Sequence, residues 1–580
     1  MKTLIKYIIF AFMVSQLGSC IVDTELREVP KDFLSPENTF TQKVVFESAL
    51  AELYRNIRNN LYMSGDSPEF HFQLGIDADI TTHILPDGVN GNALYQEYRF
   101  WNTINNSTGW VNTHWGWFYK WIFLANVVID RAEDDLVKWK TDDEKNEIVA
   151  EAKFLRAFAY KFLAHQWGDV PLVLHETKAP KFDYVRTPRM EVYQQMKADL
   201  TEAVLYMKTV DQQPGGRAPR AAAYHLLSEV NICLGDYQGA IQAASAVIND
   251  PNFYLMTERF GVRKDFTFNG YSYRGPQRAW GDVYWDLFQK GNMNWKQGNH
   301  EAIWNIQMNL TIPGGINDIN VAGEGAFDTE RHYCGFAHHN MPDKNGIVNW
   351  HKDTLSGRPA TGFCLLTSYV TELIWQYKGD WDKDIRNSEY NIKREYYWVN
   401  PASEFYGMRV SRETMALPSE YRQRTNPSFM KCVEALHYGT RIDANSGQKN
   451  DGGNIYKDWY IMRLPETYLL RAEAKFRSGD LQGAADDINV VRNRAKATPV
   501  TTSDVDIDLI LDERARELCL EEFRTCTLMR MGKLVEYLQK YNEAVKLNKY
   551  QLPAYKNLFP IPHAAIEANK NADLGQNDGY

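Results

Sequence analysis

The chain has 580 residues, of which 44% are hydrophobic and 24% charged, a composition typical of a globular protein with a large core. Its formal net charge of −9 and the lack of a long Lys/Arg run argue against a nucleic-acid surface. Aromatic residues make up 13% of the chain. Most of these rings are expected in the core, and a minority as stacking surfaces for a ligand.

The amino terminus has the pattern of a secretion signal. Two lysines precede an apolar run, 7–17, that is too short to span a bilayer. Residues 17–20 read LGSC, which resembles the lipobox of bacterial lipoproteins. We predict a lipoprotein signal peptide over residues 1–19, acylation of Cys20 as the first mature residue, and a tether over 20–42. The alternative is a simple cleaved signal with an incidental cysteine.

Four helices are predicted before the first internal repeat. Apolar residues recur at three- and four-residue steps over 44–58, 111–131, 145–166 and 190–208. Residues 59–109 lack this periodicity and are rich in Gly, Pro, Asn and aromatic residues. A loop region of this length inside a compact protein is usually functional.

Two distant segments, 224–249 and 460–495, share a helix–turn–helix pattern. Their turns read GDYQGA and GDLQGA. In each turn the first glycine suits a left-handed C-cap, and the aspartate that follows suits an N-cap. A helix pair with this turn resembles a tetratricopeptide unit, which must stack on neighbours to bury its apolar face. We predict a mostly α fold, with a tetratricopeptide-like helical-repeat scaffold and long loop-rich insertions.

The segment between the two repeats is the least regular part of the chain. Residues 263–299 are rich in Tyr and Trp among Gly, Asn and Arg, and 300–309 are predicted to form a strand-like or buried apolar segment. After the second repeat, 507–523 and 527–539 are predicted to form the last helix pair.

Several blocks spread along the chain carry a family resemblance. They are EAKFLRAF at 151–158, WGDVPLV at 167–173, TPRMEVY at 187–193, MRLPETYLLRAEA at 462–474, ERAREL at 513–518, FPIP at 559–562 and the end QNDGY at 576–580. Together they resemble the SusD/RagB family, outer-membrane nutrient-uptake lipoproteins of the Bacteroidetes type. The last block departs from the family's common pattern, with Asp578 where Pro is usual.

The resemblance implies a domain organisation. We expect an N-terminal SusD-like helical domain over 43–250, a loop-rich and aromatic-rich insertion over 251–455, and a C-terminal SusD/RagB helical region over 456–580. The family's C-terminal domain would cover roughly 300–580.

The sequence carries no recognisable catalytic, phosphate-binding or dinucleotide-binding motif. The cluster 331–339 and the acidic loop 443–451 match no common zinc or EF-hand spacing, so no metal and no cofactor are predicted. Asp380, Asp382 and Asp384 could supply paired carboxylates, but a solvated turn is favoured. Charges spaced along 513–524 are assigned to a structural ion-pair lattice rather than to catalysis.

The aromatic insertions are the best candidates for ligand binding. A flat ring covers the apolar face of a sugar, while Asn, Asp and Arg take its hydroxyl groups. By resemblance, SusD-like proteins display such a platform from loops that here correspond to 59–110 and 263–299. The predicted platform consists of Trp101, Trp110, Tyr271, Trp280, Trp285 and Trp295. Trp115, Tyr119, Ile122 and Asn126, which share one face of the helix 111–131, are assigned to the core.

The leading hypothesis, from the resemblance, is a lipid-anchored outer-membrane protein that faces the exterior and is not an enzyme. It would capture an oligosaccharide and deliver it to a SusC-like TonB-dependent transporter, with the repeat helices mostly facing that transporter. The alternatives are a RagB-like peptide-binding uptake protein, a surface glycoside hydrolase, and a periplasmic scaffold that binds protein segments. A hydrolase requires two carboxylates close together in an aromatic cleft.

Overall fold

The computed structural model describes residues 39–62, 73–75, 78–82, 100–309, 333, 341–349, 355, 364–435, 457–547, 549 and 551–580. Cys20, the predicted signal peptide and the acidic loop 443–451 lie outside the described residues, as does the cluster 331–339 apart from Tyr333.

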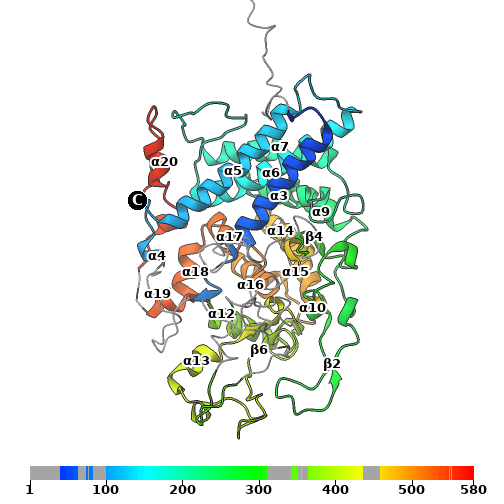
Figure 1. Cartoon of the computed structure of the whole chain (residues 1–580), viewed down its shortest axis with the longest axis vertical. Helices are drawn as coiled ribbons and strands as arrows, with labels where there is room; N and C mark the ends of the chain where they lie inside the picture. The colour runs from blue at the N-terminus through cyan, green and yellow to red at the C-terminus, as the bar shows by residue number, and fades with distance from the viewer. Residues whose placement is uncertain are drawn as a thin grey trace, which may run out of the picture.

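The fold is mostly helical, as the sequence predicts (Figure 1). The N-terminal half holds α3 (Lys43–Tyr62), α4 (Phe100–Thr103), α5 (Gly109–Arg131), α6 (Asp142–Trp167), α7 (Arg189–Tyr206), α8 (Arg220–Cys233) and α9 (Tyr237–Ile248). The C-terminal part holds α14 (Leu464–Arg477), α15 (Leu481–Arg494), α16 (Ile507–Leu518), α17 (Arg524–Arg530), α18 (Leu534–Tyr541), α19 (Glu543–Leu547) and α20 (His563–Ala568). Within the described part of the chain, no helix combines the length and apolar character needed to cross a membrane.

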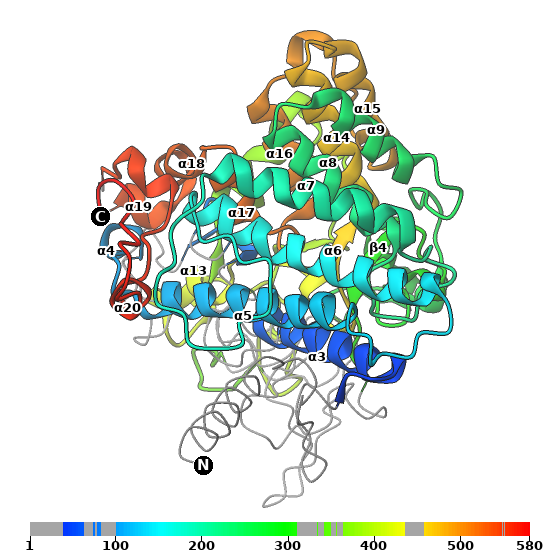
Figure 2. The same cartoon turned by 90° about the horizontal axis from the view of Figure 1, so that it is seen from above.

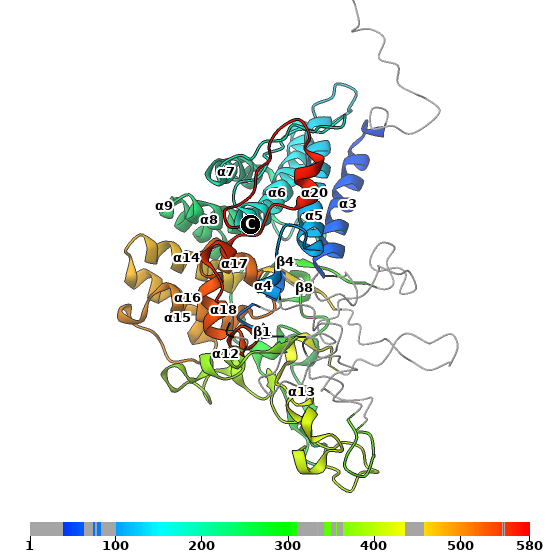
Figure 3. The same ribbon diagram turned by 90° about the vertical axis from the view of Figure 1, so that its left-hand side faces the viewer.

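The N-terminal helices form a row in which each packs on the next. Seen from above, α3, α5, α6, α7 and α8 follow one another side by side, and α9 leads on to α14 and α15 (Figure 2). The side view places this row at the top and the insertion at the bottom, with α14, α16, α17 and α18 between them, whereas α20 lies beside α5 (Figure 3).

The two repeat-like helix pairs form as predicted. Gly235 and Gly479 adopt φ angles of 76° and 89°, a left-handed conformation that is least costly for glycine. The side chains of Asp236 and Asp480 then accept hydrogen bonds from the backbone N–H groups of the next turn's glycines, at 2.9 and 2.8 Å. These N-caps fix the entry of the second helix of each pair.

The two pairs also pack on each other, although they lie far apart in the chain. Ile232 and Ala240 from the first pair share a buried cluster with Leu470 and Ala474 from the second. The small alanine side chains allow α9 and α14 to approach closely. The prediction that each unit stacks on a neighbour is therefore confirmed.

The insertion is built from short elements. Its regular pieces are β2 (Thr267–Phe268), β3 (Arg278–Ala279), α10 (Val283–Asp286), β5 (Leu365–Leu366), α12 (Ser368–Thr371), β6 (Ile392–Lys393), α13 (Tyr421–Arg424) and β7 (Ser428–Phe429). Strand β2 pairs with β3, β6 with β7, and β5 with β1 (Thr81–Thr82), all antiparallel.

The predicted strand-like segment is confirmed as β4 (Ala302–Ile306), which pairs antiparallel with β8 (Trp459–Arg463). Every residue of both strands is buried. Strand β8 leads directly into α14, so this pair joins the insertion to the second repeat.

The last predicted helix pair differs most from the structure. The segment 527–539 is not one helix, because α17 ends before Gly532, which has a φ of 66°, and α18 begins at Leu534. The preceding helix α16 ends at Leu518 rather than at 523, and Leu520 adopts a φ of 62°. A left-handed residue interrupts the hydrogen-bond pattern of a helix in both places.

A buried network of ion pairs joins the insertion to the C-terminal helices. Glu517 on α16 lies within 3.1 Å of Arg386 and 2.6 Å of Arg463, and it also pairs with Arg494. All four side chains are at most 1% exposed. The predicted lattice of structural charges is confirmed, but its partners come mainly from distant segments rather than from the same helix.

The network extends on both sides of Glu517. Glu301, which immediately precedes β4, pairs with Arg463 and Arg494 at 2.7 and 2.5 Å. One turn away on α16, Glu513 pairs with Arg386 and Arg492, both at 2.8 Å. The surrounding arginines lower the pKa of Glu513 to about 2, because they stabilise its charged form more than burial destabilises it.

Loss of one carboxylate from this network should lower the stability of the folded protein. Glu517→Gln leaves three buried guanidinium groups with less negative charge, so we expect the free energy of unfolding to fall by about 3–5 kcal/mol. Chemical denaturation measures this. The control is Glu536→Gln, which removes a half-exposed partner of Lys533 and should change stability by less than about 1 kcal/mol. Equal effects of the two variants would contradict a structural role for the network.

Candidate functional site

The insertion contains a polar groove with a volume of about 600 Å³. One wall is the loop between β2 and β3, and the other is the segment 381–397 that leads into and beyond β6. We call this hollow the insertion groove. Its lining includes Asn269, Tyr271, Ser272, Arg278, Trp381, Asp382, Lys383, Asp384, Asn387, Glu389, Arg394, Glu395 and Tyr397.

Trp381 supplies an accessible aromatic surface to the groove, since 37% of this residue is exposed. The guanidinium carbon of Arg394 lies 4.8 Å from the centre of the Trp381 rings. The backbone carbonyl of Trp381 accepts a hydrogen bond of 2.7 Å from the Asn387 amide. Trp381 is therefore held at the start of a fixed turn while part of its surface stays open to solvent.

The turn after Trp381 is anchored to the ion network. Asp384 accepts a hydrogen bond from the Arg386 backbone N–H, and its carboxylate pairs with the Arg386 side chain at 2.7 Å. Arg386 in turn contacts Glu513 and Glu517 on α16. Because Asp384 and Asn387 flank Arg386 and both line the groove, the network positions this wall.

Asp380 is also part of this anchoring. Its carboxylate pairs with Arg492 at 2.6 Å, and Asp380 and Asp384 are each 3% exposed. The favoured interpretation of a solvated turn is wrong for these two aspartates, because arginines from other segments pair with them in the interior. Asp382 is exposed.

The opposite wall is held by contacts across the groove. The Tyr271 hydroxyl donates a hydrogen bond of 3.1 Å to the Glu389 carbonyl. The Glu389 carboxylate pairs with Arg278 at 2.9 Å. Burial raises the pKa of Tyr271 well above its usual value, so its hydroxyl keeps its proton at neutral pH. The groove thus combines an aromatic surface with hydroxyl, amide, carboxylate and guanidinium groups.

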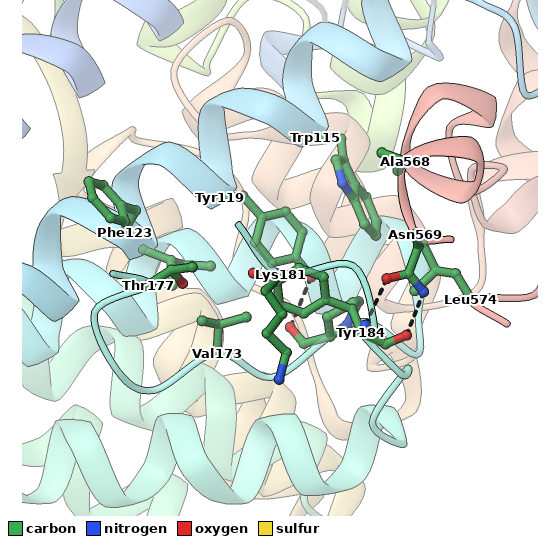
Figure 4. Close-up of a pocket in the computed structure, with 13 residues that line it drawn as sticks. Trp115, Tyr119, Phe123, Val173, Thr177, Lys181, Tyr184, Ala568, Asn569 and Leu574 are labelled. Carbon is green, nitrogen blue, oxygen red and sulfur yellow. Dashed lines mark hydrogen bonds between the residues drawn. The ribbon is translucent and has the colours of Figure 1, made fainter. Parts of the chain in front are cut away.

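A second hollow of about 350 Å³ lies between α5, the loop 171–184 and α20 (Figure 4). Its lining is mostly apolar and includes Trp115, Tyr119, Phe123, Val173, Tyr184 and Leu574. Trp115, Tyr119 and Ile122, which the sequence assigns to the core, line it. Trp115 and Ile122 are at most 7% exposed and Tyr119 is half-buried.

Key polar groups of this apolar pocket already have partners. The Tyr119 hydroxyl donates to the Pro171 carbonyl at 2.9 Å. Asn569 accepts a hydrogen bond from the Tyr184 N–H and donates one to the Tyr184 carbonyl, both at 2.7 Å (dashed lines in Figure 4). It also donates to the Ala572 carbonyl at 2.8 Å. Because these groups hold the C-terminal segment in place, the pocket suits a sugar less well than the insertion groove does.

The structure places Trp101 and Trp110 in the main core. They are 2% and 7% exposed, and both rings pack on Phe559 from the C-terminal segment, at centroid distances of 6.3 and 5.3 Å. The prediction that they offer exposed stacking faces is wrong, because the last segment of the chain covers them.

Three further predicted residues lie in a separate aromatic cluster within the insertion. Tyr271, Trp280 and Trp285 are 8%, 0% and 2% exposed. The Trp280 ring packs edge-to-face on Phe268 and on Tyr271, at 4.9 and 5.2 Å. The prediction that these three rings are exposed is also wrong, although Tyr271 is one of the residues that line the insertion groove.

Trp295, the sixth predicted residue, is half-buried. Its indole N–H donates to the Asn252 carbonyl at 2.9 Å, and its ring packs edge-to-face on His300. The six residues are therefore spread over three places, and Tyr271 alone among them lines the insertion groove.

Sequence reasoning missed Trp381 and Arg394 as groove residues. One signal was present: Trp381 lies between acidic residues of a turn, 380–384, where a core tryptophan is not expected. Arg394 carries no local signal, because its proximity to Trp381 arises from the fold.

Two family models match this chain. The SusD family model matches residues 372–580, and a model described as starch-binding associating with outer membrane matches residues 32–232. The chain belongs to the SusD/RagB family. The family resemblance read from the sequence blocks is confirmed.

Curated relatives align over most of the chain. SusD-like protein P25 of Formosa agariphila is 22% identical over 97% of this chain and 96% of its own length. The starch-binding protein SusD of Bacteroides thetaiotaomicron is 25% identical over 83% of this chain and 80% of its own length.

Solved structures share the fold. Surface glycan-binding protein A from Bacteroides thetaiotaomicron, in complex with laminarihexaose, has a TM-score of 0.64 at 19% identity, over 93% of this chain and all of its own. A laminarin-binding SusD-like protein has a TM-score of 0.62 at 20% identity, with the same coverage. The mostly helical fold is thus that of the SusD superfamily.

Burial predicts different roles for two tryptophans of the insertion. Trp280→Ala removes a ring with no exposed surface and should lower the free energy of unfolding by about 3–5 kcal/mol. Trp381→Ala removes an accessible ring whose described aromatic contact is with Arg394, and should cost about 1 kcal/mol or less. Thermal and chemical denaturation compare the variants. A larger loss for Trp381→Ala than for Trp280→Ala would contradict this assignment.

Proposed function

We propose that this protein binds an oligosaccharide in the insertion groove. The observation that carries the proposal is the combination, in one groove of about 600 Å³, of the accessible Trp381 surface with convergent polar side chains. Family relatives named for starch and laminarin binding support a carbohydrate as the ligand.

The groove matches the two kinds of surface that a sugar presents. The apolar C–H face of a sugar ring packs on an indole, while its hydroxyl groups need donors and acceptors such as those of Asn269, Ser272 and Asp382. The wall that carries Trp381 is fixed by buried ion pairs, so little ordering of the protein is needed on binding.

We further propose that the protein is a lipid-anchored outer-membrane protein that faces the exterior and passes its ligand to a SusC-like TonB-dependent transporter. The LGSC segment ending at Cys20 supports acylation. The match to the model named starch-binding associating with outer membrane supports the location. The family resemblance supports the transporter as partner.

The proposed role is capture rather than catalysis. Two groove carboxylates, Asp384 and Glu389, are each paired with an arginine, an arrangement that disfavours an acid–base pair. The relatives named above are described as binding proteins. A RagB-like peptide-binding role is the second candidate, because a tryptophan and paired charges also suit a peptide.

A glycan array followed by calorimetric titration tests the binding site. Trp381→Ala should weaken the affinity for any oligosaccharide that binds by about tenfold or more, a loss of at least about 1.4 kcal/mol. The control is Tyr254→Ala, which removes a ring that is 50% exposed and lies outside the groove lining. We expect this control to bind as the unaltered protein does.

Two results contradict the binding proposal. One is that no oligosaccharide in the array binds while a peptide library yields a ligand. The other is that Trp381→Ala binds sugars as tightly as the unaltered protein does, which would exclude the groove as the binding site.

The anchor and the partner are tested in cells that carry the native gene neighbourhood. Cys20→Ala should release the protein from the membrane fraction, because a chain without acyl groups has no lipid anchor. The acylated protein should co-purify with a large outer-membrane barrel. Retention of Cys20→Ala on membranes, or purification of the acylated protein without a barrel, would contradict this part of the proposal.

A further inference from the structure

The insertion groove contains one partly buried cation, Arg394, that forms no ion pair with a described carboxylate. The guanidinium of Arg394 donates to the Thr371 carbonyl at 2.7 Å and to the Asn387 carbonyl at 3.2 Å, and also to the Asn387 side-chain oxygen. All three acceptors are neutral. Among the residues that the structure describes, no Asp or Glu oxygen lies within 4.0 Å of this guanidinium.

The other charges of the described groove lining are either paired or exposed to solvent. Arg278 pairs with Glu389 at 2.9 Å, Asp384 with Arg386 at 2.7 Å, and Glu395 with Arg409 at 3.2 Å. Asp382 and Lys383 are adjacent, opposite in sign and both exposed. Arg394 is therefore the one partly buried charge of the described lining that forms no ion pair.

The environment of Arg394 is costly for a cation. Burial lowers the pKa of Arg394 to about 10, with Glu372 as a weaker opposing influence, so the side chain is still charged at neutral pH. Its Nε is buried and has no hydrogen-bond partner. A buried charge that is not paired raises the free energy of the site, and an anion brought close to it lowers that energy.

The position of this charge ties it to the ligand. The guanidinium lies over the Trp381 ring, 4.8 Å from its centre, and both residues line the groove. A charged substituent of a sugar that binds in the groove at the edge of this ring can therefore approach Arg394. An arginine offers a planar set of donors that suits carboxylate and sulfate oxygens.

We propose that the insertion groove selects an anionic saccharide, whose negatively charged substituent binds at Arg394 beside Trp381. This inference rests on the proposed function, because it assigns the class of sugar to the same groove. The ligand feature that Arg394 would recognise is a cluster of anionic oxygens on a sugar ring. A uronate carboxylate and a sulfate ester are its two sources.

The experiment compares matched ligands on the full-length acylated protein in detergent. A neutral β-glucan oligosaccharide, the same chain oxidised to uronates at C6, and the same chain sulfated at C6 are titrated at low and high salt. We expect one charged form to bind about tenfold or more tightly than the neutral form, as for a hydrogen bond to a charged group. That advantage should shrink as salt rises.

Arg394→Met should remove the advantage of the charged form, so that this variant binds the neutral and charged chains with affinities within about twofold of each other. Arg55→Met, which removes an exposed charge on α3, should retain the advantage and controls for the change in net charge. Because Arg394 also holds Thr371 and Asn387, Arg394→Lys is tested beside it. It keeps the charge and should keep most of the preference.

The outcomes separate this inference from the proposed function. Equal binding of neutral and charged chains by the unaltered protein overturns the anionic preference while carbohydrate binding stands. A charged-ligand advantage that persists in a folded Arg394→Met variant overturns the role of Arg394. If no saccharide in the glycan array binds, whether charged or neutral, both the proposed function and this inference are overturned.

Discussion

The position of the insertion depends on the buried charges around Glu517. This carboxylate and its neighbour Glu513 draw Arg386 from the insertion, Arg463 from β8 and Arg494 from α15 onto one helix. Buried ion pairs contribute little net stability compared with an apolar core, but they penalise any arrangement in which a partner is missing. We infer that their role here is to specify one placement of the irregular insertion on the helical scaffold.

This placement has a direct consequence for the groove. Arg386, the insertion's main contribution to the network, lies between two groove residues, Asp384 and Asn387. A fixed Arg386 therefore fixes the wall that carries Trp381. The helical scaffold and the ligand surface are thus linked through charge, whereas the rings of Trp280 and Trp285 stabilise the insertion from within its own aromatic cluster.

Local sequence patterns were sufficient to predict the helical scaffold, but not the residues that line the insertion groove. The Gly-Asp turns predict both repeat pairs, because a left-handed glycine and an aspartate N-cap act within a few residues. Whether an aromatic ring is exposed depends on segments far away in the chain: Phe559 covers Trp101 and Trp110, and Tyr390 packs on Trp280. Trp381 and Arg394 meet across a turn whose shape is set by arginines that no local pattern assigns to it.

A crystal structure of the protein with a bound oligosaccharide tests the central claim most directly. We expect a sugar ring in the insertion groove, packed on the accessible surface of Trp381, with the segment 381–397 unchanged because the ion network holds it. A saccharide bound in the apolar pocket beside Tyr119 and Tyr184, or elsewhere on the helical scaffold with the insertion groove left unoccupied, would contradict the account.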